Sequence, residues 1–266
     1  MDSLEFEKSL ASVLSWWDEA GVETPTIAPA KPKKRAPLKR AATPAAKSAA
    51  PRPTKPKMPA PSDDTFAKAA EAMAAKCKTL AELKAAVEGF NAGALSDAAR
   101  GAVFSRGNPD ADIMIIGEAP GISEDAAGQP FIGPAGQLLD KIFASIGLGE
   151  DSLYITNVVN WRAPSSGKPT DSDIALCLPI IRRHIALAKP KLIVIVGGVS
   201  MSALTGLKGI TKMRGNWETL NIERPDGTES FPALITYHPA YLLRQPHLKR
   251  DVWRDMLSLK AKIETL

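Results

Sequence analysis

The hydrophobic residues of this chain follow a spacing that changes along its length, and each change predicts an element. Four stretches are continuously apolar and short enough for buried strands: 111–117, 153–159, 191–198 and 233–239. Helical spacing separates the first three, at 136–146 and 171–188, and recurs at 248–263. Apolar strands that alternate with helices indicate an α/β fold with a parallel sheet covered on both faces.

Smaller elements complete this pattern. Residues 65–90 fit one or two helices, with Leu80, Leu83 and Val87 spaced for a buried face. A short helix is expected at 200–205. The region 209–231 is irregular, with two strands as one interpretation of its pattern.

The N-terminal 62 residues differ from the rest in composition. Between Lys31 and Lys57 there are ten Lys and Arg residues and no acid, in a background of Ala, Pro, Thr and Ser. Such a stretch cannot bury a core and is expected to be disordered. The net charge of the whole chain is +5, and this stretch alone carries +10, so the rest of the chain has a net charge near −5. The excess of positive charge is therefore concentrated in this stretch. This segment is either a solubilising linker or a tether for a polyanion, most simply DNA or RNA, through residues such as Lys33, Lys34 and Arg35.

These differences predict three parts: an amphipathic helix within 1–22, a disordered basic linker at 23–62 and a globular domain at 63–266. The helix either docks on the globular domain or binds a protein partner, and both alternatives stay open. Its apolar positions are Leu4, Phe6, Leu10, Val13, Leu14 and Trp17.

Composition excludes several classes of protein. No apolar run approaches the roughly 20 residues of a membrane span, and the acidic N-terminus is unlike a signal peptide. Cys77 and Cys177 are 100 positions apart, so they indicate neither a disulfide framework nor a metal-binding pair. We expect the protein to be a monomer that binds no metal and does not contact a membrane. Its expected location is a cytoplasm of the bacterial type, in association with the nucleoid.

Polar residues lie at or just beyond the carboxyl ends of three of the predicted strands. Glu118 comes directly after the first, Asn157 lies in the second and His238 near the end of the fourth. Because ligands of open α/β sheets bind beyond the carboxyl ends of the strands, we expect these side chains to converge. Together they could hold a water, read a planar heterocycle and stabilise a developing anion. Each also has a structural alternative: Glu118 as a loop cap, Asn157 as a partner of backbone groups and His238 as a turn residue.

Two further features lie in the same region. Phe131, between Pro130 and Gly133, is either a core residue or an aromatic face offered to a flat ligand. The glycine runs "GEAPG" and "VGGVS" could cradle phosphates of a nucleotide cofactor. Neither run fits the dinucleotide or Walker pattern, so this alternative has little support.

Three motifs carry a resemblance to a known family. They read "GEAPGISEDAAGQPFIGPAGQLLDKI", "YITNVVNWR" and "YHPAYLLRQP". They resemble the uracil-DNA glycosylase superfamily, closest to its family 4, over about residues 90–257. The resemblance implies a three-layer α/β/α fold with a four-stranded parallel sheet. It also implies a monofunctional enzyme of base excision repair that flips uracil out of single- or double-stranded DNA and hydrolyses its N-glycosidic bond.

The resemblance also assigns roles to residues. It makes Glu118 the residue that positions or activates water and His238 the residue that stabilises negative charge on uracil. The substrate-binding residues would be Ala119, Gly121, Glu124, Asp125, Phe131, which stacks on the base, and Asn157, which reads its edge. Leu242 or Leu243 would enter the duplex, and Arg244 would bind DNA beside them.

One departure concerns a cofactor. Typical family-4 members hold an iron–sulfur cluster through four cysteines, and the corresponding positions here are Phe90, Gly93, Trp161 and Cys177. Because one thiolate cannot hold such a cluster, no cluster is expected, with apolar packing by Phe90 and Trp161 in its place. Two functional alternatives remain: a glycosylase for another deaminated base, hypoxanthine or xanthine, and a non-catalytic module that binds damaged DNA.

Overall fold

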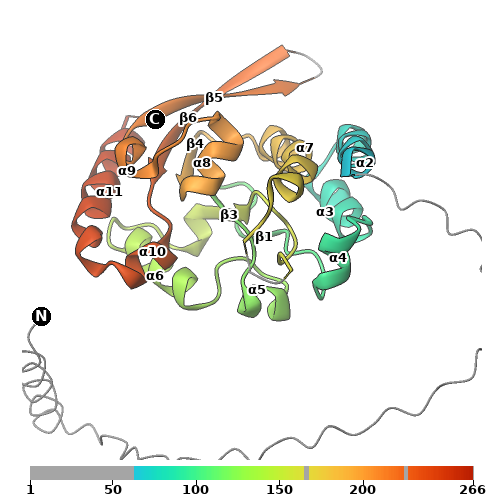
Figure 1. Ribbon diagram of the computed structural model, residues 1–266. Helices are drawn as coiled ribbons and strands as arrows, with labels where there is room; N and C mark the ends of the chain where they lie inside the picture. The colour runs from blue at the N-terminus through green and yellow to red at the C-terminus, as the bar shows by residue number, and fades with distance from the viewer. Residues whose placement is uncertain (1–62, 165–167, 225–226, 266) are drawn as a thin grey trace, which may run out of the picture. The chain divides into compact units, whose positions relative to one another are not determined.

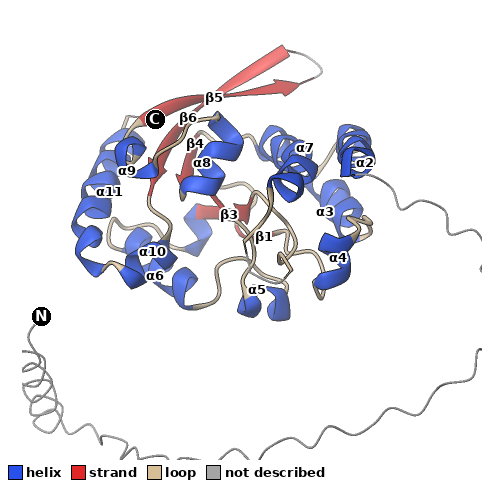
Figure 2. Ribbon diagram, in the orientation of Figure 1, coloured by secondary structure: helices blue, strands red, loops and turns tan. Residues whose placement is uncertain are grey.

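The computed structural model describes residues 63–164, 168–224 and 227–265. The predicted N-terminal helix and the basic linker, with Lys33, Lys34 and Arg35, lie outside the described residues. Within the described part, helices cover both faces of one central sheet (Figures 1 and 2).

The sheet has six strands in the order β1-β3-β2-β4-β6-β5. The central four are parallel to one another, and the two edge strands β1 and β5 are antiparallel to their neighbours. The predicted four-stranded parallel sheet is thus confirmed, with an antiparallel strand added at each edge. The strands are β1 (Ser105–Gly107), β2 (Ile113–Gly117), β3 (Leu153–Asn157), β4 (Leu192–Val196), β5 (Trp217–Arg224) and β6 (Gly227–Thr236).

Helices form the two outer layers. The face with the N-terminal helices of the domain carries α2 (Asp63–Lys76), α3 (Leu80–Glu88), α4 (Ala94–Ala98), α7 (Asp171–Ala188) and α8 (Gly198–Thr205). The other face carries α6 (Pro134–Ala144), α10 (Pro239–Arg244) and α11 (Lys249–Ile263). The connecting elements are α5 (Ile122–Ala127), α9 (Ile210–Met213) and the 3₁₀ turns η1 (Glu150–Ser152) and η2 (Pro246–Leu248).

The continuous apolar runs of the strands follow from these two layers. Ile113 and Ile115 of β2 point into the core under α6 and α11, whereas Met114 and Ile116 point into the core under α2 and α7. Successive side chains of a strand point to opposite faces of the sheet, so a strand covered on both faces is apolar at every position. All five residues of β2 are accordingly buried.

The helix starts were predictable where a capping residue is present. The side chain of Thr170 accepts a hydrogen bond from the amide of Asp173, whose carboxylate accepts one from the amide of Thr170. This reciprocal pair satisfies two amides that a helix start leaves unpaired, and it sets the beginning of α7 at the predicted residue. By contrast, α5 and α10 were not among the predicted helices, and each is only six residues long.

No helix among the described residues reaches the length and apolarity that crossing a membrane requires.

Candidate functional site

The residues predicted to converge lie at or beyond the carboxyl ends of three parallel strands, of which β2 and β3 are neighbours and β6 is separated from β2 by β4. Glu118 follows β2, Asn157 ends β3, and His238 lies two residues beyond β6. Strands β2 and β3 are parallel neighbours, and Gly117 lies opposite Asn157 in their register. We call Gly117, Glu118, Phe131, Asn157 and His238 the strand-end site.

Two side chains of the strand-end site approach each other at Gly117. A Cβ atom at this position would lie 2.3 Å from Cζ of Phe131 and 2.4 Å from Oδ1 of Asn157. The ring of Phe131 and the amide of Asn157 therefore meet over a backbone that has no side chain of its own. Only glycine permits this approach, a role that sequence reasoning did not assign to Gly117.

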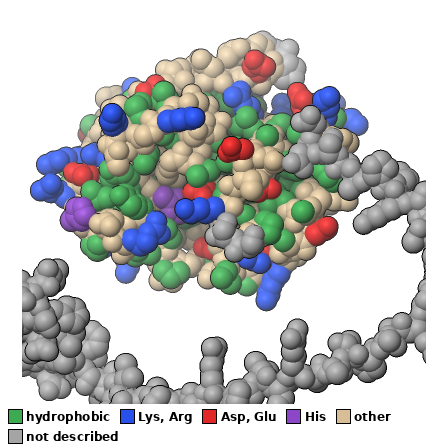
Figure 3. Space-filling model, in the orientation of Figure 1, with side chains coloured by type: hydrophobic (Ala, Val, Ile, Leu, Met, Phe, Trp, Pro, Cys, Tyr) green, Lys and Arg blue, Asp and Glu red, His purple; other side chains and the backbone are tan. Residues whose placement is uncertain are grey.

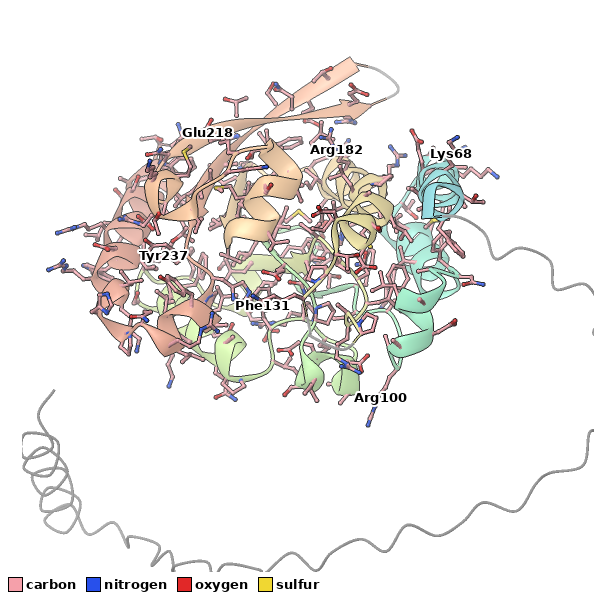
Figure 4. The ribbon with its side chains drawn as sticks, viewed as in Figure 1. Lys68, Arg100, Phe131, Arg182, Glu218 and Tyr237 are labelled. Carbon is pink, nitrogen blue, oxygen red and sulfur yellow. The ribbon has the colours of Figure 1, made fainter. Side chains whose placement is uncertain are left out.

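Phe131 also contacts the third element of the site. Its ring centroid lies 5.6 Å from that of His238, at an interplanar angle of 31°. Phe131 lies inside the molecule, among side chains from several elements (Figure 4). Asn157 and His238, which are far apart in the sequence, thus share Phe131 as a neighbour.

Asn157 brings an unpaired acceptor to the site. Its side chain is buried, with 2 % exposure, and its Oδ1 has no hydrogen-bond partner within the described part of the protein. A buried polar atom without a partner costs about 1–3 kcal/mol, so such an atom indicates a ligand that completes it. The missing partner must be a donor.

His238 is held as a neutral ring. Its Nδ1 accepts a hydrogen bond from the amide of Ala240 at 3.2 Å, which caps α10. Burial lowers the pKa of His238 to about 4, and the charge of Arg244 acts in the same direction against a smaller opposing effect of Glu124. Because Nδ1 accepts, the proton of the neutral ring is on Nε2, which can donate to a ligand.

Glu118 is the carboxylate that directly follows Gly117 in the chain. Its carboxyl is half-buried, and burial raises its pKa above the ordinary value while the charge of Lys168 opposes this shift. Its backbone carbonyl accepts from the amide of Val159, which ties the residue to the chain that follows β3. A carboxylate held in partial burial is suited to orienting water or stabilising positive charge.

Glu124, predicted to bind substrate, has three partners within the protein itself. Its two oxygens accept from the backbone amides of Gly121, Ile132 and Gly133, at 3.1, 3.1 and 2.9 Å. These bonds close the loop that carries Phe131, so Glu124 shapes the loop. They also occupy the amide of Gly121, another predicted substrate contact.

Asp125 likewise has protein partners. One oxygen accepts from the amide of Arg100 at 2.8 Å, and the other accepts from Nε of Arg162 at 3.1 Å. The side chain is buried and joins three separate segments. Its role as a substrate contact stays a prediction. Ala119, also predicted to contact the substrate, packs half-buried against the apolar core under α7.

Phe131 itself has a strained backbone. Its φ is +55°, in the left-handed region that a non-glycine residue adopts at a cost of order 1–3 kcal/mol. Two residues that sequence reasoning missed hold it there. Arg106 donates to the carbonyls of Pro130 and Phe131, at 2.9 and 3.2 Å. A Cβ at Gly136 would lie 1.7 Å from the carbonyl oxygen of Phe131, so the start of α6 abuts this peptide.

The structure separates the two leucines proposed to enter DNA. Leu242 is fully buried among residues of α6 and α11, so its assignment as a DNA contact is wrong. Leu243 is 46 % exposed. Arg244 is also exposed, with its guanidinium 5.9 Å from the ring centroid of Tyr241. Lys and Arg side chains gather on the side of the molecule formed by α10 and α11 (Figure 3).

Comparison with known proteins gives a consistent result. The family model of the uracil DNA glycosylase superfamily matches residues 104–257. A type-4 uracil-DNA glycosylase of Pyrobaculum aerophilum is 36% identical over 158 residues, 59% of this chain and 81% of the relative. The type-4 enzymes of Sulfurisphaera tokodaii and Thermotoga maritima are 38% and 36% identical, over 60% and 61% of this chain and 73% and 83% of theirs.

The fold and the strand-end site define an α/β/α protein that gathers an aromatic ring, an amide and an imidazole at the carboxyl ends of its parallel strands. The match over residues 104–257 specifies that class further: this chain belongs to the uracil-DNA glycosylase superfamily. Within the superfamily, its similarity is to the type-4 enzymes.

These matches correct one prediction. The absence of an iron–sulfur cluster was expected from the cysteine content. The relatives are type-4 enzymes, a class known for such a cluster, and this finding contradicts the expectation of no cofactor.

The residues of this chain do not, however, fit a cluster bound by four cysteines. The chain has two cysteines, Cys77 and Cys177, and both are buried. The rings of Phe90 and Trp161 lie 6.3 Å apart. In residues 63–164, 168–224 and 227–265, no group of three or more His, Cys, Asp or Glu side chains could hold a metal ion.

Proposed function

We propose that this protein removes uracil from DNA by hydrolysing the N-glycosidic bond, as a repair enzyme that leaves an abasic site. The observation that carries the proposal is the buried, unpaired Oδ1 of Asn157 beside the ring of Phe131. A planar base with an N–H at its edge would donate to Oδ1 of Asn157 and stack on the ring of Phe131. Membership of the uracil-DNA glycosylase superfamily supports uracil as that base.

Asn157 would select uracil through two hydrogen bonds. Its Oδ1 accepts from uracil N3–H and its Nδ2 donates to O4, whereas cytosine presents an acceptor at N3 and an amino group at C4. A two-bond pairing of this kind discriminates by about 1–3 kcal/mol. The wrong base would also leave buried groups unpaired, which adds to the difference.

Asn157→Asp should weaken this discrimination. An aspartate at the same position, when protonated, can donate to N3 and accept from the amino group of cytosine, so release of cytosine should rise relative to uracil. The measurement is single-turnover release of each base from otherwise identical oligonucleotides. An unchanged ratio of the two rates would remove Asn157 from the reading of the base.

Reaching this site requires the base to leave the helix. Glycosylases flip the target nucleotide out of the stack at a cost of a few kcal/mol, which contacts to the flipped base must offset. Phe131 would stack on the base, and Leu243 would fill the space left in the duplex. Its exposure, next to the exposed Arg244, supports this assignment.

Leu243→Ala should therefore slow release from duplex DNA by about tenfold, the lower part of what losing a buried leucine costs. Release from single-stranded DNA should change little, because no vacated stack needs filling. Comparison of single-turnover rates on the two substrates tests this, and equal losses on both would contradict the assignment.

Cleavage of the bond places positive charge on the sugar and negative charge on the uracil. Glu118 would stabilise the first and orient the attacking water. His238, neutral with its proton on Nε2, would donate to the uracil anion. The raised pKa of Glu118 and the lowered pKa of His238 both follow mainly from burial.

The purified protein tests the function directly. It should release uracil from single- and double-stranded oligonucleotides, read by cleavage at the resulting abasic site. A panel with hypoxanthine and xanthine separates the alternative of another deaminated base. Binding of uracil DNA without release, at all salt concentrations, would favour a non-catalytic module and contradict the proposal.

Some predictions rest on the sequence alone. Binding of DNA by the basic linker, a protein partner for the N-terminal helix and a monomeric state stay predictions. Action in the cytoplasm, on the nucleoid, is proposed from the cysteine spacing and the basic segment.

A further inference from the structure

We infer that Arg106 is a positioning residue for the base-stacking ring of Phe131. It acts by fixing the backbone carbonyl groups of Pro130 and Phe131. The inference rests on the proposed function, and it adds to the site a residue from β1, the three-residue edge strand. None of the three sequence motifs contains it.

The guanidinium of Arg106 is the centre of a network that joins two backbone carbonyls to two exposed carboxylates. Its side chain is 8 % exposed and contacts four acceptors on three segments. Nε donates to the carbonyl of Pro130 and Nη2 to that of Phe131, at 2.9 and 3.2 Å. The same group pairs with Asp140 of α6 and with Glu150 of η1. Arginine presents five N–H donors in a rigid planar fork, which holds backbone and carboxylate oxygens in a fixed geometry that the point charge of a lysine does not impose.

These bonds act on the one strained peptide of the site. Phe131 has φ +55°, and its carbonyl lies against the backbone of Gly136. Arg106 binds that carbonyl, while Glu124 binds the next two amides, of Ile132 and Gly133. The guanidinium of Arg106 thus holds the carbonyls of Pro130 and Phe131, and the carboxylate of Glu124 holds the two amides that follow. Together these hydrogen bonds must offset the backbone strain of Phe131.

The position of the ring follows from this backbone. With Phe131 in the left-handed region, its Cζ reaches over Gly117, beside Oδ1 of Asn157. A shift of the Phe131 peptide toward an ordinary φ would swing the ring away from the amide and from His238. Stacking contributes to binding of the base before and during bond cleavage, so its loss should raise KM more than it lowers kcat.

Arg106→Gln tests the inference, because glutamine keeps a donor but loses the charge and the fork. We expect KM for uracil-containing DNA to rise about tenfold, the scale of one lost base–aromatic stack, with kcat changed less than about threefold. In a Phe131→Ala background the same substitution should have no further effect. Lys191→Ala is the matched control, since Lys191 pairs with Asp112 at the opposite ends of the strands.

A second readout needs no activity. Phe131-Ile132 is the only Phe-Ile pair in the chain, so carbonyl-13C phenylalanine with 15N isoleucine gives one amide signal in NMR. Arg106→Gln should shift that signal, and Lys191→Ala should not. An unmoved signal, or losses that add to those of Phe131→Ala, would overturn the inference on Arg106. A wild-type protein that releases no uracil would instead overturn the proposed function, while the NMR result still decides whether Arg106 holds the peptide.

Discussion

His238→Ala should lower the single-turnover rate of uracil release by about 10²–10³-fold, the usual cost of losing one preorganised donor to a developing anion. The donor is already in place, because Nδ1 is occupied by the amide of Ala240 and the proton is on Nε2. The substitution also removes the cap of α10, so unfolding is monitored in parallel. His238→Asn keeps a capping acceptor without the imidazole donor, and it should be nearly as slow.

The pH profile separates the roles of His238 and Glu118. With a pKa of about 4, His238 is neutral at all higher pH values, so its protonation does not limit the rate near neutrality. Glu118 acts as a carboxylate with a raised pKa, so the rate should fall as the pH decreases through that pKa. This acid limb should persist in His238→Ala and disappear in Glu118→Gln.

A matched control is available for the histidine. His247 is exposed on η2, outside the strand-end site, and His247→Ala should leave the rate within about twofold of the wild type, as for a surface substitution. A rate for His238→Ala within tenfold of the wild type would contradict the assignment of His238 as the donor.

Gly117→Ala should lower kcat/KM by about 10²-fold, since displacing a bound group by about 1 Å costs this much. The added methyl group would lie 2.3 Å from the ring of Phe131 and 2.4 Å from Oδ1 of Asn157, so both must move. The ring cannot yield freely, because Arg106 and Gly136 hold its backbone. We expect the protein to remain folded, with an overpacking cost of about 1–3 kcal/mol.

The control for this substitution is another glycine. A Cβ at Gly101 would meet no atom within 4 Å, so Gly101→Ala should retain full activity. Circular dichroism and thermal unfolding of both variants distinguish a blocked site from a failure to fold. A folded Gly117→Ala protein with wild-type kcat/KM would show that the base does not bind over this backbone.

The layered fold was predictable because its signals are local. A strand buried on both faces, such as β2, must be apolar at every position, and a capped start such as that of α7 is written in adjacent residues. The edge strands were less predictable: β1 has three residues, and β5 is stabilised by its pairing with β6 rather than by its own pattern.

For the site, the sequence determined which residues follow the parallel strands, and so selected Glu118, Asn157 and His238. Only the tertiary structure decided what their neighbours do. Leu242 and Leu243 are adjacent and identical, yet packing of α10 on α6 and α11 buries the first and exposes the second.

The same holds for the charged residues around Phe131. Glu124 and Asp125 resemble substrate contacts in the sequence, but their oxygens bind amides and an arginine of the protein itself. Arg106 has no motif around it and gains its position only when β1 pairs with β3. Spacing along the chain fixes which face of an element a residue occupies. The partner of a buried charge lies on a segment that is distant in the sequence and comes close only on folding, so no local sequence pattern identifies it.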